Sequence, residues 1–306
     1  MKNLQTLIGN YLDFCQNQKR LDEKTLKAYR IDLRQFEEQI GENDPEHITP
    51  ELLETFIAGL HQSYRPKTVK RKIASLKALF HYFEYKDMIE RNPFHKVQVR
   101  FREPVILPKT IPLHTVEVFL STMYREMKQA DTPAQKRNVL RDIAVIELLF
   151  ATGMRISELC ALTPGDVNLC EGTILIYGKG AKERKLQIGN EDVRRILAEY
   201  REEYREEIRE WDCFFINHCG KPLSDQAVRR MINKYTALAA IEMHITPHMF
   251  RHTFATSLLE ADVDIRYIQE MLGHSSINIT EIYTHVALQK QGDILREKHP
   301  RKGFCI

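Results

Sequence analysis

Residues 246–255 read Thr-Pro-His-Met-Phe-Arg-His-Thr-Phe-Ala. Thr246 is suited to cap a helix and Pro247 to fill its first position, where a proline loses no helical hydrogen bond. His248 and Arg251 are three residues apart and therefore share one face of that helix. Because a helix N-terminus favours an anion, the stretch predicts a helix that begins with an anion-facing cationic pair. An isolated His and Arg at this spacing are, however, more often ordinary surface residues.

A second stretch, Ala151-Thr-Gly-Met-Arg-Ile-Ser-Glu-Leu159, places Arg155 among apolar neighbours. A guanidinium near a core is unfavourable unless a partner holds it, and Glu158 follows one helical turn later. Two interpretations follow. The first is a simple structural Arg155–Glu158 pair. The second is an arginine that Glu158 holds rigid and aims at a phosphate, whose oxygens match its planar fork.

Three further side chains could serve the same chemistry. Residues 178–183 read as a hairpin loop, from which Lys179 could donate a proton to a leaving oxygen, although a loop lysine is usually just solvated. His274 follows a glycine that ends a helix. Tyr283 could attack a phosphate, although a lone tyrosine at helical spacing is more often a core residue. Two arginines, a lysine, two histidines and a tyrosine form an inventory suited to phosphate cleavage.

Composition and charge restrict the class of protein. A chain of 306 residues, 43% hydrophobic and 28% charged, is long enough for two domains. It has no apolar run of the roughly 18–20 residues that a membrane helix needs, no signal peptide at its start and no Cys-x-x-Cys pair. We therefore expect no metal site, no membrane association and a cytoplasmic, nucleoid-associated location. From Arg65 to Arg102, eleven Lys or Arg stand against three Asp or Glu, and such a basic block favours phosphate contact.

The pattern of apolar residues predicts a mainly α-helical chain with a small antiparallel β-sheet. Residues 1–96 show helical periodicity and are expected to form an N-terminal helical domain. Residues 97–112 contain three prolines, which indicates an extended linker. Residues 113–306 are expected to form the second domain. Its predicted elements include strands at residues 173–177 and 184–188 and one charged, solvated helix at residues 192–211.

Taken together, these motifs resemble the tyrosine recombinase (phage integrase) family, most closely its Xer-like bacterial members. Their order and spacing match, and the resemblance covers almost the whole chain. Thr25-x-x-x-Tyr29 and the stretch from Thr68 to Leu76 are similar to the family's N-terminal core-binding domain. The resemblance implies a SAM-like helical bundle and a catalytic domain that form a C-shaped clamp on DNA. The motifs that carry it are residues 151–159, 178–184, 246–255, 272–275 and 282–285.

The resemblance also implies a reaction. Tyr283 would attack a scissile DNA phosphate, form a 3′-phosphotyrosyl link and release a 5′-hydroxyl. Arg155 and Arg251 would stabilise the charge that builds on the non-bridging oxygens. The phosphotyrosine stores the bond energy, so no cofactor would be needed. The remaining roles would fall to Lys179 as general acid, His248 in proton transfer, His274 as a hydrogen-bond donor to phosphate and Glu158 as the residue that orients its neighbours.

The implied partners are a double-stranded DNA recombination site, further copies of this chain in a tetramer on DNA, and an accessory protein or related recombinase. The biological outcome would be chromosome dimer resolution or the integration and excision of a mobile element. Two other functions stay open: a non-cleaving DNA-binding regulator of the same fold, and a type IB topoisomerase that relaxes DNA. The expected DNA contacts are Lys24, Lys27, Arg30, Lys67, Lys70, Arg71 and Lys77.

Overall fold

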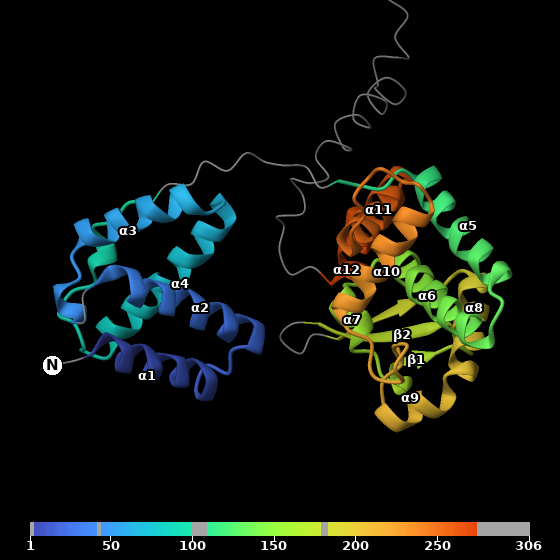
Figure 1. Cartoon of the computed structure of the whole chain (residues 1–306), viewed down its shortest axis with the longest axis horizontal. Coiled ribbons are helices and arrows are strands. Elements are labelled where there is room, and N and C mark those ends of the chain that lie inside the picture. The colour runs from blue at the N-terminus through green and yellow to red at the C-terminus, as the bar shows by residue number, and fades with distance from the viewer. Residues whose placement is uncertain (1–2, 42–43, 100–108, 179–182, 274–306) are drawn as a thin grey trace, which may run out of the picture. The chain divides into compact units, whose positions relative to one another are not determined.

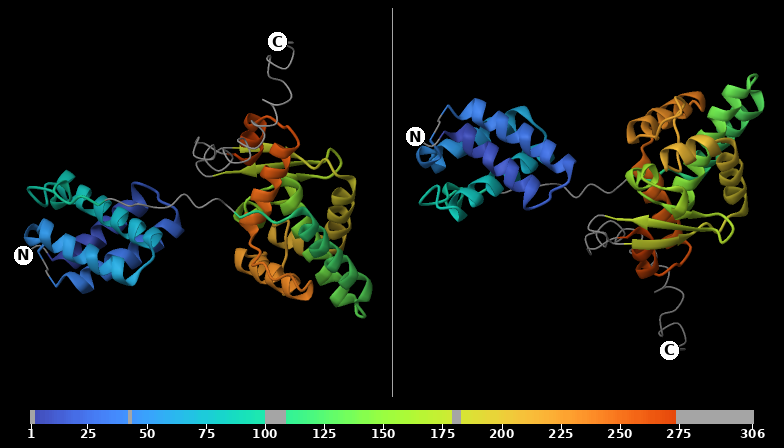
Figure 2. Two further views of the ribbon diagram at one scale, coloured as in Figure 1. Left: turned by 90° about the horizontal axis from the view of Figure 1, so that it is seen from above. Right: turned by 90° about the horizontal axis from the view of Figure 1, so that it is seen from below.

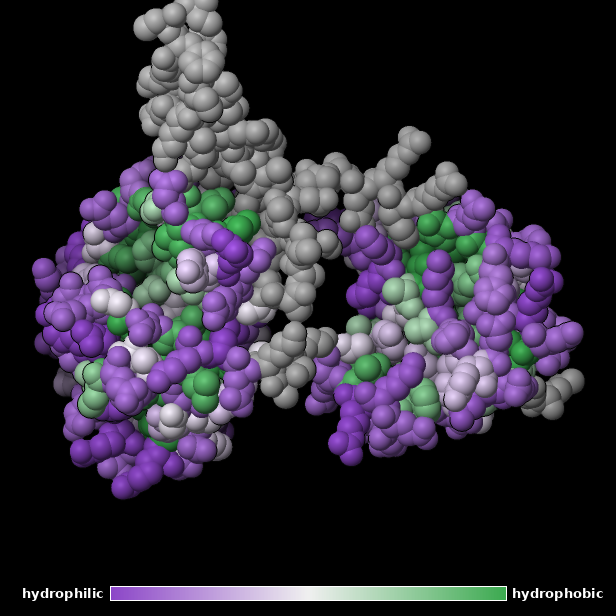
Figure 3. Space-filling view, turned by 180° about the vertical axis from the view of Figure 1, so that it is seen from behind, coloured by the Kyte–Doolittle hydropathy of each residue, from purple (hydrophilic) through white to green (hydrophobic). Residues whose placement is uncertain are grey.

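Helices make up most of the protein, and one small antiparallel sheet accompanies them, as the sequence predicts (Figure 1). The chain divides into two units, residues 1–105 and 106–306, each with a hydrophobic core of its own. Charged and polar residues cover most of the face of each unit that Figure 3 shows, with apolar residues gathered in smaller patches. The computed structural model describes residues 3–41, 44–99, 109–178 and 183–273.

The described part of the N-terminal unit is a bundle of helices whose ends follow local sequence signals. Asp22 caps the second helix by accepting a hydrogen bond from the Thr25 N–H at 2.9 Å. Gly41 ends that helix at φ +69°, a left-handed conformation that glycine adopts without strain. The elements are α1 (Leu4–Asn17), α2 (Glu23–Ile40), η1 (Pro45–His47), α3 (Pro50–Ser63), α4 (Pro66–Tyr85) and η2 (Pro93–His95).

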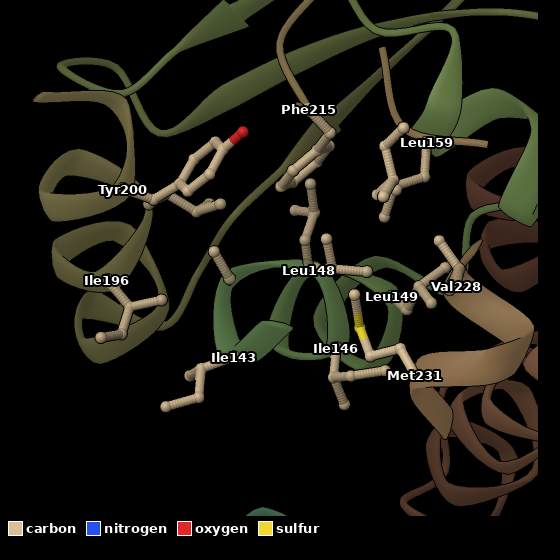
Figure 4. Close-up of a cluster of buried hydrophobic side chains, with 14 of the residues drawn as sticks. Ile143, Ile146, Leu148, Leu149, Leu159, Ile196, Tyr200, Phe215, Val228 and Met231 are labelled. Atoms are coloured by element: carbon tan, nitrogen blue, oxygen red, sulfur yellow. The ribbon is translucent and has the colours of Figure 1, made fainter. Parts of the chain in front are cut away.

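In the C-terminal unit, α6 (Pro133–Thr152) is the central helix, and α5, α8 and α11 pack against it. Leu148 on α6 is fully buried, and it lies among apolar side chains from other elements, such as Leu159, Tyr200 and Phe215 (Figure 4). This core fixes the helices that surround it. They are α5 (Leu113–Gln129), α7 (Ile156–Cys160), α8 (Glu191–Glu203), α9 (Arg205–Trp211), α10 (Asp225–Leu238), α11 (Pro247–Glu260) and α12 (Ile265–Leu272), with η3 (Pro164–Asp166) after α7.

The sheet has the order β1-β2-β3 and is antiparallel throughout. The predicted hairpin is present as β2 (Thr173–Tyr177) and β3 (Glu183–Gln187), so the second strand begins one residue earlier than predicted. β1 (Val167–Asn168) was not predicted, because two residues carry no periodicity. The sheet lies at one side of the unit, and α12 runs beside β3 (Figure 2).

The single helix predicted at residues 192–211 is wrong, because the chain forms α8 and α9 with a break at Tyr204. The Tyr204 backbone leaves the helical conformation, at φ −109° and ψ 17°. Its ring is buried, the Arg137 guanidinium lies 4.0 Å from the ring centroid, and its hydroxyl donates to the Arg137 carbonyl at 3.0 Å. Packing of one tyrosine therefore interrupts a segment whose local sequence favours a continuous helix.

Candidate active site

Arg155 occupies the N-cap of α7, on a tight turn that follows α6. Gly153 reverses the chain at φ +60°, and a Cβ there would come within 2.5 Å of the Phe254 ring, so the turn requires glycine. Met154, only 1% exposed, anchors the turn in the core. The turn thus fixes the backbone of Arg155, while the Arg155 side chain remains 35% exposed.

Glu158 is a buried carboxylate that accepts four hydrogen bonds. Two come from Arg155, from its backbone N–H and from Nη1, both at 2.8 Å. The other two come from Arg184 on β3, from Nη1 at 3.1 Å and from Nη2 at 2.6 Å. Burial alone would raise the pKa of Glu158, but the hydrogen bonds from Arg184 and Arg155 outweigh it and lower that pKa. Glu158 therefore stays ionised and holds both arginines.

The Arg155–Glu158 pair expected from the sequence is present, and Arg155 still reaches solvent. Both residues line a groove of about 1220 Å³ in the C-terminal unit, between α7, the β2–β3 strands and α12. The structural interpretation and the phosphate-binding interpretation of Arg155 are thus compatible, because pairing engages one edge of the guanidinium and leaves the side chain partly open.

Arg251 lies on the first turns of α11, which begins at Pro247 as predicted; Thr246 is its N-cap, although its side chain donates or accepts no capping hydrogen bond. The Arg251 side chain is buried, with the residue 5% exposed. Nη1 donates to the carbonyl of Gly153 at 2.9 Å, and Nη2 donates to the carbonyl of Leu272 at 2.7 Å. Arg251 therefore joins the end of α6 to the end of α12.

His248 lies near three arginines. Partial desolvation, followed by the positive charges of Arg229, Arg251 and Arg155, lowers the pKa of His248. The residue is exposed to solvent, which weakens both the desolvation and the effect of the charges. Arg229, on α10, was not predicted as a site residue, since it belongs to no motif and only folding brings α10 to the start of α11.

A smaller hollow of about 660 Å³ opens at the start of α11. His248 lies on its wall together with His252, whose pKa is lowered by desolvation and then by the charges of His248 and Arg251. Both imidazoles therefore favour the neutral form near pH 7, in which one ring nitrogen can accept a proton.

Three predicted site residues, Lys179, His274 and Tyr283, lie outside the described residues. Their described chain neighbours are nevertheless informative. Gly178, which precedes Lys179, and Gly273, which precedes His274, both line the groove of Arg155. The fold thus brings Gly178 and Gly273 to the groove that holds Arg155 and Glu158.

The predicted DNA-contact residues lie on two neighbouring helices of the N-terminal unit. Asp32 of α2 connects these helices: its buried carboxylate pairs with Arg71 of α4 at 2.5 Å and accepts hydrogen bonds from Lys72 Nζ at 3.1 Å and Ser75 Oγ at 2.9 Å. Lys72 is buried in this network, whereas the seven predicted residues are exposed to solvent. They are Lys24, Lys27 and Arg30 on α2, and Lys67, Lys70, Arg71 and Lys77 on α4.

No group of three or more His, Cys, Asp or Glu side chains in the described ranges is arranged to hold a metal ion. No helix within the same ranges is both long enough and apolar enough to cross a membrane.

Comparison with known proteins relates the chain to one group. Residues 120–290 match the model of the "Phage integrase family", and residues 8–86 match "Phage integrase, N-terminal SAM-like domain". A "Tyrosine recombinase" of Agathobacter rectalis is 66% identical over 99% of both chains. "Tyrosine recombinase XerD" of Listeria innocua is 35% identical over 97% of this chain and 100% of its own length.

Among solved structures, the XerH site-specific recombinase bound to palindromic difH substrate has a similar fold. The TM-score is 0.76 at 23% identity, with 97% of this chain and 98% of that chain covered.

Proposed function

This chain belongs to the phage integrase family of tyrosine recombinases, a family of DNA breaking and rejoining enzymes, and from that premise we propose how its residues act. Tyr283 attacks a scissile phosphate at a recombination site and forms a 3′-phosphotyrosyl intermediate. The 5′-hydroxyl of a second strand then displaces the tyrosine, so that two duplexes exchange strands. Each step exchanges one phosphodiester bond for another, and no cofactor is consumed.

The observation that carries this proposal is the rigid placement of two arginines around one turn, Arg155 on the turn after α6 and Arg251 bound to it from α11. Arg251 binds the carbonyl of Gly153, and Arg155 follows two residues after that glycine with its own carboxylate partner. Positive charge that is fixed before the reaction stabilises a transition state without reorganisation. Two such guanidinium groups suit the non-bridging oxygens of a phosphate on which negative charge builds.

Proton transfer would fall to the remaining residues. A tyrosine with a pKa near ~10 is mostly neutral at pH 7 and must lose its proton as it attacks. His248 is available to take it, because its lowered pKa keeps the imidazole neutral. Lys179 would protonate the leaving 5′-oxygen, and His274 would donate a hydrogen bond to the phosphate.

Most of the other tyrosines in the described part of the C-terminal unit are unsuited to act as the nucleophile, which supports Tyr283 in that role. In the C-terminal unit, Tyr200, Tyr204 and Tyr235 are buried, and burial raises the pKa of each. A buried phenol with a raised pKa is a poor nucleophile for an external phosphate. Two other tyrosines in the described part of this unit are well exposed, Tyr177 at 56% and Tyr267 at 62%, and both line the groove. They are therefore the rivals that an experiment must exclude.

We propose that the DNA duplex contacts the basic faces of α2 and α4 in domain 1–96 and the groove of Arg155 in domain 113–306, two domains that linker 97–112 connects. Exposed lysines and arginines that contact phosphates make binding strongly salt-dependent. Exchange between two duplexes requires a tetramer of this chain on DNA. The named relatives are bacterial, so the protein would act in the cytoplasm, on the nucleoid.

The test is covalent capture on a nicked suicide substrate, in which loss of the nicked fragment traps the phosphotyrosine. Denaturing electrophoresis then measures the amount of covalent protein–DNA adduct. We expect wild type, Tyr177→Phe and Tyr267→Phe to form the adduct, and Tyr283→Phe to form none.

Each other outcome has a defined meaning. An adduct that persists in Tyr283→Phe, or disappears in Tyr267→Phe, shows that the nucleophile is assigned wrongly. Absence of an adduct from wild type on cognate DNA that it binds favours the non-cleaving regulator. Relaxation of supercoils without recombinant product favours the topoisomerase.

A further inference from the structure

We propose, on the basis of the function proposed above, that Arg184 is a positioning residue of the cleavage reaction. Through Glu158 it fixes the guanidinium of Arg155, and through the carbonyl of Met271 it joins that guanidinium to the end of α12. Arg184 lies on β3, one residue after the strand begins.

Each nitrogen of the Arg184 guanidinium donates a hydrogen bond to a protein acceptor. Nη1 and Nη2 donate to the two oxygens of Glu158 at 3.1 and 2.6 Å, and Nε donates to the carbonyl of Met271 at 2.9 Å. The side chain is 10% exposed, compared with 35% for Arg155. Because Nε, Nη1 and Nη2 of Arg184 all donate to protein acceptors, we assign its effect on the reaction to the groups that it holds.

Arg184 anchors the Arg155–Glu158 pair to another part of the fold. Arg155 and Glu158 are three residues apart on one short helix, so their ion pair can move as a unit. Arg184 lies 26 residues beyond Glu158 and approaches from the sheet. Its bidentate contact fixes both the position and the plane of the carboxylate, and the carboxylate in turn orients Arg155 Nη1 at 2.8 Å.

The third bond of Arg184 reaches the segment that leads into His274. α12 ends at Leu272, and Gly273 follows at φ +64°. A Cβ at Gly273 would come within 2.9 Å of Arg184 Nη1, so the glycine backbone lies directly against the guanidinium. Arg184, on β3, therefore contacts Glu158 of α7 and the end of α12 at one point of the groove.

The experiment compares full-length wild type, Arg184→Gln and Arg184→Lys in single-turnover adduct formation, with DNA affinity measured separately by gel shift. Arg184→Gln should slow the chemical step on the order of 10²-fold, the size of effect that follows from a misplaced catalytic group, with DNA affinity within about twofold of wild type. Arg184→Lys should recover only part of the rate, because an ammonium cannot replace a planar fork. Arg209→Gln, which removes an exposed arginine from α9, is the matched control and should react like wild type.

A second substrate separates positioning from a merely structural role. A methylphosphonate at the scissile position removes the charge that Arg155 stabilises, so the contribution of the whole Arg184–Glu158–Arg155 chain should fall. On this substrate, the ratio of the wild-type cleavage rate to the Arg184→Gln rate should be at least tenfold smaller than on the phosphate substrate. Arg155→Ala, whose rate deficit should shrink for the same reason, is the reference variant.

Three results overturn the inference: cleavage by Arg184→Gln within twofold of wild type, an equal deficit on both substrates, or full rescue by Arg184→Lys. If Arg184→Gln does not fold in a thermal unfolding assay, Arg184→Lys is judged on the same two substrates by the same criteria. Failure of the proposed function gives a different result, because wild type would then form no adduct or Tyr283→Phe would still form one.

Discussion

Replacing Glu158 with glutamine should destabilise the C-terminal unit and leave the N-terminal unit unchanged. The carboxylate accepts four hydrogen bonds, two on each oxygen. Glutamine keeps one oxygen and turns an NH₂ group toward arginine donors. Two hydrogen bonds are therefore lost, and the Arg184 side chain, 10% exposed, loses its counter-ion. Removing one partner of a buried ion pair lowers the free energy of unfolding by about 3–5 kcal/mol.

Thermal unfolding measures this change. In a unit of this size each kcal/mol moves Tm by roughly 2–4 °C, so we expect the transition of the C-terminal unit to fall by roughly 10 °C at pH 7. The transition of the N-terminal unit serves as an internal reference. Glu206→Gln is the matched control, because its carboxylate is 65% exposed and pairs with Arg209 on the surface; such a change should stay within about 0.5 kcal/mol.

The pH dependence provides a second check on Glu158. Its folded pKa lies below the usual value for glutamate. The ionised carboxylate therefore contributes its full stability above the unfolded pKa of about 4.3, and this contribution is lost as pH falls through the folded pKa. The Tm difference between wild type and Glu158→Gln should be constant near pH 7 and narrow below about pH 4. If wild type and Glu158→Gln differ at pH 7 by less than about 1 kcal/mol in free energy of unfolding, Glu158 does not hold the two arginines as described.

Three other predictions follow from single contacts. Arg229→Gln should raise the pKa of His248, which NMR titration of the imidazole measures. Because the neutral ring accepts the proton, the acidic limb of the pH–rate profile of cleavage should move to higher pH. An unchanged titration would exclude Arg229 as a cause of the lowered pKa. Gly153→Ala should lower the free energy of unfolding by at least about 3 kcal/mol, because backbone strain at φ +60° adds to a 2.5 Å approach of the new Cβ to Phe254. Gly41→Ala is strained at φ +69°, but no atom lies within 4 Å of its Cβ, so it should lose only about 1 kcal/mol. Equal losses would contradict the steric argument. Lys27→Gln should reduce the slope of log affinity against log salt by about 0.9, while Arg209→Gln leaves the slope unchanged; a slope unaffected by Lys27 would remove that lysine from the DNA contact.

The elements that the sequence predicts well are those defined by adjacent residues. Pro247 begins α11 as predicted, because a proline at the first helical position loses no hydrogen bond there. β2 matches its predicted range because a short run of Thr, Ile and Tyr residues favours a strand. The break at Tyr204 was not predicted, because it depends on a contact with Arg137, which lies 67 residues away in the chain.

The contacts that define the site are distant in sequence. Arg251 binds a carbonyl 98 residues earlier, and Arg184 binds Glu158 across 26 residues. No periodicity or cap encodes such pairs. Arg184 follows the hairpin loop that drew attention to Lys179, yet nothing in that local pattern distinguishes a buried arginine from an exposed one.

By itself, the sequence of this protein determined its chemical inventory, its helical class and its family, because side-chain types, caps and motif spacing are local properties of the chain. Only the tertiary structure decided how that inventory is supported: that Glu158 serves two arginines, that Arg251 connects the ends of α6 and α12, and that Arg229 lies near His248. The physical reason is that hydrogen bonds and electrostatic fields act through space. Residues far apart in the chain therefore acquire their roles when the packing of α6, α11, α12 and the sheet brings them together.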